Sequence, residues 1–278
     1  MINKLITCLL VFINLLFLRN SDASRYIIFE GCSTGMFSQF QMVLSLCQLY
    51  ENGEIKGGEV NFKKNGFYYD VQKGENWWEY YFEPLYFGKS KRTDICRFNS
   101  IACSNIEYSN TRFENFKLIK KYIRLKPHIL EKEKYFIDNN FINYYVIGVH
   151  YRGTDKKCEA PRVSYETVKL VIEEHIQSLK EYNWKIFVAT DEIAFLNYLT
   201  TLFPGRVCCN SEAFRSENQT PIHGNYPDAY QGGEEAILDC LLLSKSNILI
   251  RTSSNLSLVS TYFNPELSVI ELSKRYGY

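Results

Sequence analysis

Short apolar runs alternate with amphipathic stretches through the second half of the chain. The runs are rich in β-branched and aromatic residues, which predicts buried strands; they lie at Tyr145–Val149, Lys185–Ala189, Arg206–Cys209, Asn247–Ile250 and Leu267–Leu272. The stretches between them have helical spacing, and they lie after Ser164, at Ile193–Leu202, at Glu234–Ser246 and after Ser257 to about Tyr262. Because strands that alternate with helices form parallel sheets, this order predicts a doubly wound α/β domain.

The first half of the mature chain begins with one strand–turn–helix unit. Arg25–Glu30 predicts a strand, Gly31–Gly35 a turn, and Phe37–Glu51 a helix. The turn lacks the lysine of a phosphate-binding loop, so it is either a ligand-binding turn or a tight connection. The aromatic stretch Asn76–Phe87 either fills a core, which we favour, or stacks on sugars. Phe113–Asn140 predicts a helix that is broken near Pro127.

The pattern divides the chain into three parts. Residues 1–24 form a leader in which Lys4 precedes the apolar stretch Leu5–Leu18, with a small residue at Ala23. This is a cleavable signal peptide or, alternatively, a membrane anchor through residues 5–18. Both interpretations place the protein in the secretory pathway, in the lumen of the ER or Golgi, or outside the cell. The domain junction is expected between Asp138 and Asn143, which gives domains of residues 25–142 and 143–278.

The composition of the chain limits the classes of protein to which it could belong. Apolar residues make up 46% of the chain and its net charge is +1, which argues against disorder and against general nucleic-acid binding. Nine cysteines are present, and none has the spacing of a zinc site. In an oxidising compartment Cys96 and Cys103 could form a disulfide, with buried thiols as the alternative. Asn218-Gln219-Thr220 is an acceptor sequence for N-glycosylation.

Polar clusters follow three of the predicted strands, at His150–Glu159, at Thr190–Glu192 and at Thr252–Ser257. In a parallel sheet the carboxyl ends of the strands meet at one edge, where α/β proteins bind ligands. Arg152 offers a planar fork for phosphate, or else forms an ion pair with Asp155. Thr252, Ser253 and Ser254 begin a helix, which is an anion site through its hydroxyls and amides, or else only a helix cap.

Several ionisable residues near these ends could complete a site. Glu159 and Asp155 are candidate bases for an acceptor hydroxyl, or they orient Arg152 and Lys156. His150 could bind a base or ribose, or belong to the core. Asp239 lies in an apolar helix and needs a partner, either a nucleobase or a neighbouring protein group. Asp191 and Glu192 are ligands or helix caps.

Three segments together resemble one family. GVHYRGTDK at Gly148–Lys156, FVATDE at Phe187–Glu192 and EEAILDCLLLSKSNILIRTSS at Glu234–Ser254 are similar to segments of α1,6-fucosyltransferases, which include eukaryotic core enzymes and bacterial nodulation enzymes. Their order and spacing also agree, over roughly residues 145–272. The amino-terminal half matches only loosely. The resemblance implies a GT-B fold of two Rossmann-like domains with parallel sheets, in which the second domain binds GDP-fucose.

The resemblance also implies roles for individual residues. Arg152 would hold the β-phosphate, Thr252, Ser253 and Ser254 would lie beside the diphosphate, and Asp191 and Glu192 would lie near the donor. His150 and Asp239 would contact guanine. Glu159 matches the family's base only if one residue is deleted after Lys156. Gly153 departs from the pattern, because the family usually carries a second arginine there, and the loss of that charge is expected to weaken donor binding or alter acceptor geometry.

The sequence therefore predicts an inverting fucosyltransferase that uses GDP-fucose without a metal or other cofactor and modifies a glycan acceptor through an α1,6-linkage. Two alternatives stay open. One is a fucosyltransferase that makes α1,2-linkages or modifies protein hydroxyls. The other is a secreted carbohydrate-binding protein that keeps the fold without catalysis.

Overall fold

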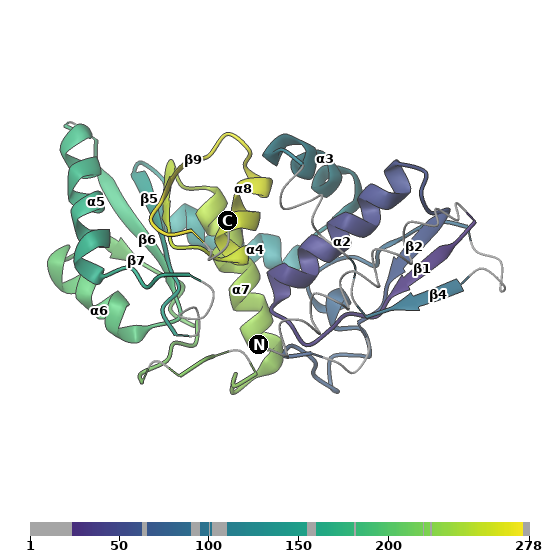
Figure 1. Ribbon diagram of the computed structural model, residues 1–278. Helices are drawn as coiled ribbons and strands as arrows, with labels where there is room; N and C mark the ends of the chain where they lie inside the picture. Colours follow the sequence, from purple (N-terminus) through teal and green to yellow (C-terminus); the bar gives the residue numbers. More distant parts are fainter. Residues whose placement is uncertain are drawn as a thin grey trace. The chain divides into compact units, whose positions relative to one another are not determined.

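The computed structural model describes residues 24–62, 66–89, 95–99, 101, 110–154, 160–180, 182–218, 220–222 and 224–274 (Figure 1). The chain divides into two compact units, Met1–Leu125 and Lys126–Tyr278. No helix among the described residues is long and apolar enough to cross a bilayer. The predicted leader, Asp155, Glu159, Cys103 and His223 lie outside the described residues.

The first unit contains a four-stranded sheet in the order β3-β2-β1-β4. Its strands are β1 (Tyr26–Phe29), β2 (Gly57–Val60), β3 (Tyr86–Gly88) and β4 (Ile95–Phe98). β1 pairs in parallel with β2 and β4, whereas β3 is antiparallel to β2. The helices of this unit are α2 (Met36–Glu51), η1 (Trp77–Tyr80) and α3 (Arg112–Tyr122).

Most of the aromatic stretch Asn76–Phe87 is core, although Tyr86 is 73% exposed. Trp77 and Trp78 are 1% and 2% exposed. Trp78 stacks on Phe82 with ring centroids 4.1 Å apart, and Phe62 lies 4.7 Å from the Trp77 ring. Rings packed in this way are unavailable to an external sugar, which confirms the core interpretation.

The second unit is a five-stranded parallel sheet in the order β7-β6-β5-β8-β9. Its strands are β5 (Tyr145–Tyr151), β6 (Trp184–Thr190), β7 (Val207–Cys208), β8 (Ile248–Arg251) and β9 (Ser268–Glu271). Its helices are α4 (Pro127–Asn140), α5 (Tyr165–Ser178), α6 (Ile193–Leu202), α7 (Ala229–Ser244) and α8 (Asn255–Phe263). The predicted α/β class with two Rossmann-like, largely parallel sheets is confirmed, and β3 is the antiparallel exception.

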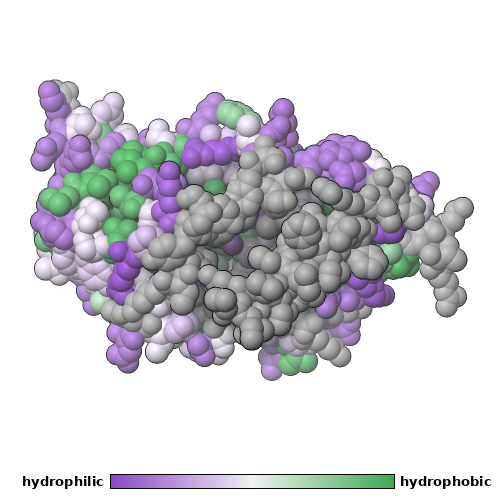
Figure 2. Space-filling view, viewed as in Figure 1, coloured by the Kyte–Doolittle hydropathy of each residue, from purple (hydrophilic) through white to green (hydrophobic). Residues whose placement is uncertain are grey.

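Both faces of the second sheet are covered. Successive side chains of a strand point to opposite faces. Ile147 and Val149 accordingly pack with the apolar side chains of α5 and α6, and Val146 packs with those of α7. Figure 1 shows α5 and α6 on one side of this sheet and α4 and α7 on the other. Figure 2 shows apolar surface where α5 lies, in line with Leu170 being 55% exposed.

Two predicted boundaries differ from the structure. α4 belongs to the second unit, since Lys132 pairs with Glu234 of α7 and Lys245 lies 3.5 Å from Glu133, so the units divide before α4 and not at residue 142. α7 begins at Ala229, five residues before Glu234. It therefore includes Gly232 and Gly233, which were expected to precede the helix.

The early start of α7 has a local cause. Asp228 caps the helix by accepting a hydrogen bond from the Gln231 amide at 2.9 Å. A Cβ atom on Gly232 would lie under 3.0 Å from the Tyr226 ring. The absence of a side chain at Gly232 is therefore a packing requirement and does not interrupt the helix.

Candidate functional site

The three polar strand ends meet at one edge of the second sheet. β5 lies between β6 and β8, and all three run in parallel. Tyr151 is in register with Thr190, and His150 with Arg251. The sequence prediction that these ends gather is confirmed, and the edge they form is where α/β sheets bind ligands.

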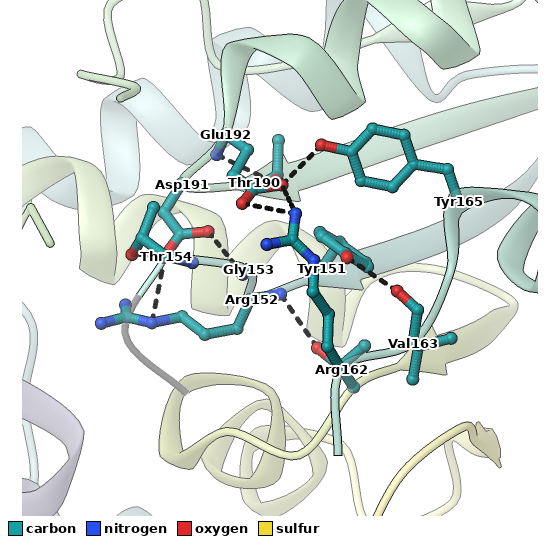
Figure 3. A network of polar contacts seen from close by, with 11 residues as sticks. Tyr151, Arg152, Gly153, Thr154, Arg162, Val163, Tyr165, Thr190, Asp191 and Glu192 are labelled. Carbon is teal, nitrogen blue, oxygen red and sulfur yellow. Dashed lines mark hydrogen bonds and ion pairs between the residues drawn. The ribbon is translucent and has the colours of Figure 1, made fainter. Parts of the chain in front are cut away.

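Arg152 lies directly beside the start of α8. Its backbone amide donates a hydrogen bond to the Thr252 hydroxyl at 2.9 Å. Its side chain, 11% exposed, places Nε 3.2 Å from the Asp191 carboxylate (Figure 3). The predicted partner Asp155 lies outside the described residues. Because Asp191 engages Nε, it holds the flat guanidinium in one orientation.

Asp191 also fixes the loop that follows β5. Its carboxylate accepts hydrogen bonds from the Gly153 amide at 3.0 Å and from the Thr154 hydroxyl at 2.5 Å. The N-cap of α6 is Glu192, whose side chain makes no capping bond. Neither carboxylate therefore caps the helix, which removes one of the two alternatives that the sequence left open.

The carboxylate of Glu192 is turned away from Arg152 toward α5. It is 1% exposed and accepts hydrogen bonds from Arg162 at 3.0 and 3.2 Å and from the Tyr165 hydroxyl at 2.6 Å (Figure 3). Neither Arg162 nor Tyr165 was identified from the sequence. Tyr165 comes directly after the N-cap Ser164, and nothing in its local pattern distinguishes it from a core aromatic residue.

The segment between β8 and α8 is held by hydrogen bonds from several sides. The Thr252 amide donates to the His150 carbonyl at 3.0 Å, and the Ser253 amide donates to the Ser273 hydroxyl at 3.0 Å. Ser254 is the N-cap residue of α8, but its side chain makes no capping bond. The candidate donors are therefore the Ser253 and Ser254 hydroxyls with the amides of the first helical turn.

A buried arginine, Arg251, forms hydrogen bonds that hold this segment in place. Arg251 is 8% exposed, and its guanidinium donates to Glu271 at 2.7 Å and to the Ser257 hydroxyl at 3.3 Å. The sequence analysis did not assign Arg251 a role, although its position at a strand end could have drawn attention to it. Ser257, the hydroxyl residue of a second sequon, Asn255-Leu256-Ser257, is fully buried.

A small hollow of about 10 Å³ lies at this edge. It is bordered by Arg152, Gly153, Ala160, Pro161, Arg162, Val163, Thr252, Ser253 and Ser273. That volume holds about one water molecule. The segment that joins Thr154 to Ala160 is outside the described residues and contains both candidate bases.

A larger cavity of about 450 Å³ lies beside the amino-terminal half of α7. Its lining includes Phe214, Arg215, Tyr226, Gln231 and Glu235. Pockets of this size and mixed lining are typical of small-molecule sites. The loop that carries Phe214 and Arg215 is attached to β6, because the Ser216 amide donates to the Asp191 carbonyl at 2.8 Å.

Asp239 lies one helical turn beyond Glu235 and is 7% exposed. Its Oδ1 atom has no hydrogen-bond partner among the described residues, and the same is true of the Arg215 Nε atom. Burial raises the pKa of Asp239 to about 7; the charge of Arg215 lowers it and that of Glu235 raises it further. An unpaired buried carboxylate is costly, so Asp239 has the character of a ligand-binding group.

His150 lies on the same face of the sheet as α7. It follows Val146 and Gly148 in the two-residue alternation of β5, and a Cβ atom on Gly148 would contact Leu243 of α7. Its side chain is buried, with the residue 4% exposed. The structure therefore brings His150 and Asp239 to one face of the sheet.

The remaining predictions from the sequence have mixed outcomes. Among the described residues, Cys32, Cys47, Cys96, Cys208, Cys209 and Cys240 are free thiols. The proposed bridge involves Cys103, whose position is not described. No cluster of three or more His, Cys, Asp or Glu side chains suited to a metal occurs in the described part of the chain.

Comparison with known proteins identifies the class of fold. No protein-family model matches the sequence, and no curated protein sequence is significantly similar to it. Solved structures do match. The NodZ α-1,6-fucosyltransferase soaked with GDP-fucose superposes with a TM-score of 0.65 at 15% identity, over 89% of this chain and 94% of that one.

Two further structures come from other fucosyltransferases. POFUT1 in complex with GDP matches with a TM-score of 0.53 at 13% identity, over 90% of this chain and 98% of that one. An Arabidopsis thaliana FUT1 variant in complex with GDP matches with a TM-score of 0.54 at 9% identity, over 92% and 72%. The chain therefore shares the fold of GT-B fucosyltransferases, as the resemblance implied.

Proposed function

We propose that this protein is a fucosyltransferase that uses GDP-fucose as its donor. The observation that carries the proposal is the contact between Arg152 and the start of α8, in which the Arg152 amide donates to Thr252 at 2.9 Å. The Arg152 guanidinium, held by Asp191, and the hydroxyls and helix amides that follow the neighbouring strand β8 are groups suited to a diphosphate. Fold neighbours bound to GDP or GDP-fucose support the same choice of donor.

The chemistry follows from where charge develops. The acceptor hydroxyl attacks the anomeric carbon of fucose, the bond from that carbon to the β-phosphate oxygen breaks, and GDP departs with the electron pair. Arg152, with Thr252, Ser253 and Ser254, stabilises the charge that grows on the leaving diphosphate. Glu159, or in its place Asp155, accepts the proton of the hydroxyl. A single displacement inverts the anomeric configuration.

The nucleobase would occupy the α7 side of the site. Guanine presents two adjacent N–H donors, and the carboxylate of Asp239 is a matching acceptor with an unpaired Oδ1 atom. His150 supplies a second polar group on that face. The cavity of about 450 Å³, whose lining includes Phe214 and Tyr226, provides volume for a ring system.

The acceptor, the linkage and the location are part of the proposal. We propose a glycan acceptor and an α1,6-linkage, on the basis of the NodZ similarity. The match to POFUT1, at a TM-score of 0.53, leaves transfer to protein hydroxyls as the main alternative, which linkage analysis of the product separates. We further propose that the leader of residues 1–24 directs the protein into the secretory pathway, which protease protection in microsomes tests.

The test of function is release of GDP from GDP-fucose with and without candidate glycans. We expect acceptor-dependent turnover that persists in excess EDTA. We also expect Arg152→Ala to abolish turnover and to lower the melting temperature by only a few degrees, because Asp191 keeps its hydrogen bonds from the Gly153 amide and the Thr154 hydroxyl. Arg206→Ala is the matched control, because Arg206 lies at the opposite end of the sheet, beside Asn183 and Trp184. Full turnover by Arg152→Ala would refute the proposed role. Binding of GDP-fucose without turnover, with every acceptor class tried, would favour a non-catalytic carbohydrate-binding protein.

A further inference from the structure

The space beside Gly153 is filled by another residue. A Cβ atom at Gly153 would lie under 3.0 Å from the carboxylate atoms of Glu192. Any larger side chain here would displace that carboxylate. Gly153 therefore has a second consequence besides the absence of an arginine charge. It leaves room for the Glu192 carboxylate beside the backbone next to Arg152.

The Glu192 carboxylate, which occupies this space, forms an ion pair with a second arginine, Arg162. Glu192 is buried, and an ionised carboxylate in that position needs partners. Arg162 supplies one, and both of its contacts with Glu192 are made by a single nitrogen, Nη2. Tyr165 supplies the other through its hydroxyl. Burial and the hydrogen bond to Glu192 raise the pKa of Tyr165, so the phenol stays protonated and keeps donating.

Arg162 is the more exposed member of the ion pair. The Arg162 side chain is 30% exposed and that of Glu192 is 1% exposed. Arg162 borders the same hollow as Arg152, Thr252 and Ser253. Figure 3 shows Arg162 reaching toward Glu192 from one side and Tyr165 from the other. Arg152 and Arg162, which come from separate segments, therefore border the same hollow.

We propose that Arg162 is a second guanidinium of the diphosphate site and supplies from the segment before α5 the charge that Gly153 lacks. This inference rests on the proposed function, because it assigns a residue to the donor site. Guanidinium groups bind phosphate oxygens through paired N–H donors, and a diphosphate has oxygens enough for two. Glu192 and Tyr165 then act as positioning residues for Arg162, as Asp191 does for Arg152.

Calorimetric titration with GDP tests the proposal on four proteins: wild type, Arg162→Met, the double variant Arg162→Met with Glu192→Gln, and the control Arg206→Met. We expect Arg162→Met to weaken GDP affinity by about 10- to 100-fold, the loss of one charge-assisted contact. Arg206→Met should bind as wild type does. Arg162→Met should also lower the melting temperature, since it leaves Glu192 buried and unpaired.

The double variant separates binding from structure. Removing both charges should restore the melting temperature, and under our proposal the GDP affinity stays low. If stability and affinity recover together, Arg162 serves only the ion pair and the inference is overturned. A parallel measurement needs no variant: GDP should protect Arg162 of the wild type from phenylglyoxal, as read by mass spectrometry, and equal labelling with and without GDP would also overturn it.

The same titration, with Arg152→Ala added, distinguishes this inference from the proposed function. If the wild type shows no GDP binding, both fail. If the wild type binds GDP, Arg152→Ala abolishes binding, and the double variant binds as tightly as wild type, only the role of Arg162 fails.

Discussion

The substitution Asp239→Asn should stabilise the fold most at alkaline pH while weakening nucleotide binding. Burial raises the pKa of Asp239 from 3.8 to about 7. A shift of that size, at about 1.4 kcal/mol per pKa unit, corresponds to about 4 kcal/mol of destabilisation when the group is ionised in both states. This is an upper bound, because structural relaxation around the charge would reduce it.

The sign follows from proton uptake. The folded protein holds the Asp239 proton up to a pH of about 7, whereas the unfolded chain releases it near pH 4. The destabilising contribution is therefore absent below pH 4, grows between pH 4 and 7, and is complete above pH 7. Asparagine cannot ionise, so any cost of burying its amide is the same at every pH and does not alter the slope.

The assay is urea denaturation of wild type and Asp239→Asn at several values between pH 5 and 8. The free energy of unfolding of the variant, relative to wild type, should rise by about 2–3 kcal/mol over that range. Asp138→Asn is the matched control, because the Asp138 side chain is 45% exposed in a helix-surface ion pair and should give no such trend. Parallel profiles for Asp239→Asn and wild type would show that this carboxylate does not carry a buried charge.

The same variant tests recognition of the base. If the ionised carboxylate accepts two N–H bonds from guanine, Asp239→Asn should weaken GDP binding by about 100-fold and reduce the preference for GDP over ADP. Binding of GDP to the wild type should weaken by up to about tenfold per pH unit below pH 7, since protonation removes an acceptor. Unchanged GDP affinity in the variant would remove Asp239 from the site even if the stability result holds.

Three further variants test packing and helix capping within the two units. Gly153→Ala should destabilise the second unit by about 1–3 kcal/mol in thermal melts, because its Cβ displaces Glu192; an unchanged melting temperature would show that the loop moves freely. Trp78→Ala should cost about 3–5 kcal/mol in urea denaturation by removing a buried ring stacked on Phe82, and a loss below 1 kcal/mol would contradict the described core. Ser164→Ala should cost about 1 kcal/mol, since the Ser164 hydroxyl accepts from the Thr167 amide at 3.0 Å, and no change would exclude the cap.

The parallel sheet of the second unit could be predicted because its strands are locally encoded. The run Tyr145–Val149 is apolar on both faces, and Ile193–Leu202 has helical spacing, so β5 and α6 were located closely from sequence. The edge where the polar clusters meet followed from the parallel topology alone. Asp239 was recognisable as a lone carboxylate in an apolar helix.

What could not be predicted depends on contacts between distant residues. The pairing of Arg162 with Glu192 joins residues that are 30 apart in sequence, and it requires the space left by Gly153. From the sequence, Gly153 could be interpreted only as the loss of a charge. Similarly, Gly232 was expected to precede the helix, and the packing of the Tyr226 ring against it could not be predicted from the local sequence.

The adjacency of Asp191 and Glu192 explains how one strand end can orient two arginines. Consecutive side chains leaving a strand point to opposite sides. Asp191 accordingly points to Arg152 and the loop after β5, and Glu192 points to Arg162 and α5 (Figure 3). Each guanidinium group therefore has its own carboxylate. Exchange of the two residues would lengthen the side chain beside Arg152 and shorten the one that reaches Arg162. The geometry of this site therefore requires the shorter acid at Asp191 and the longer acid at Glu192. Two negative charges in the opposite order would not meet that requirement.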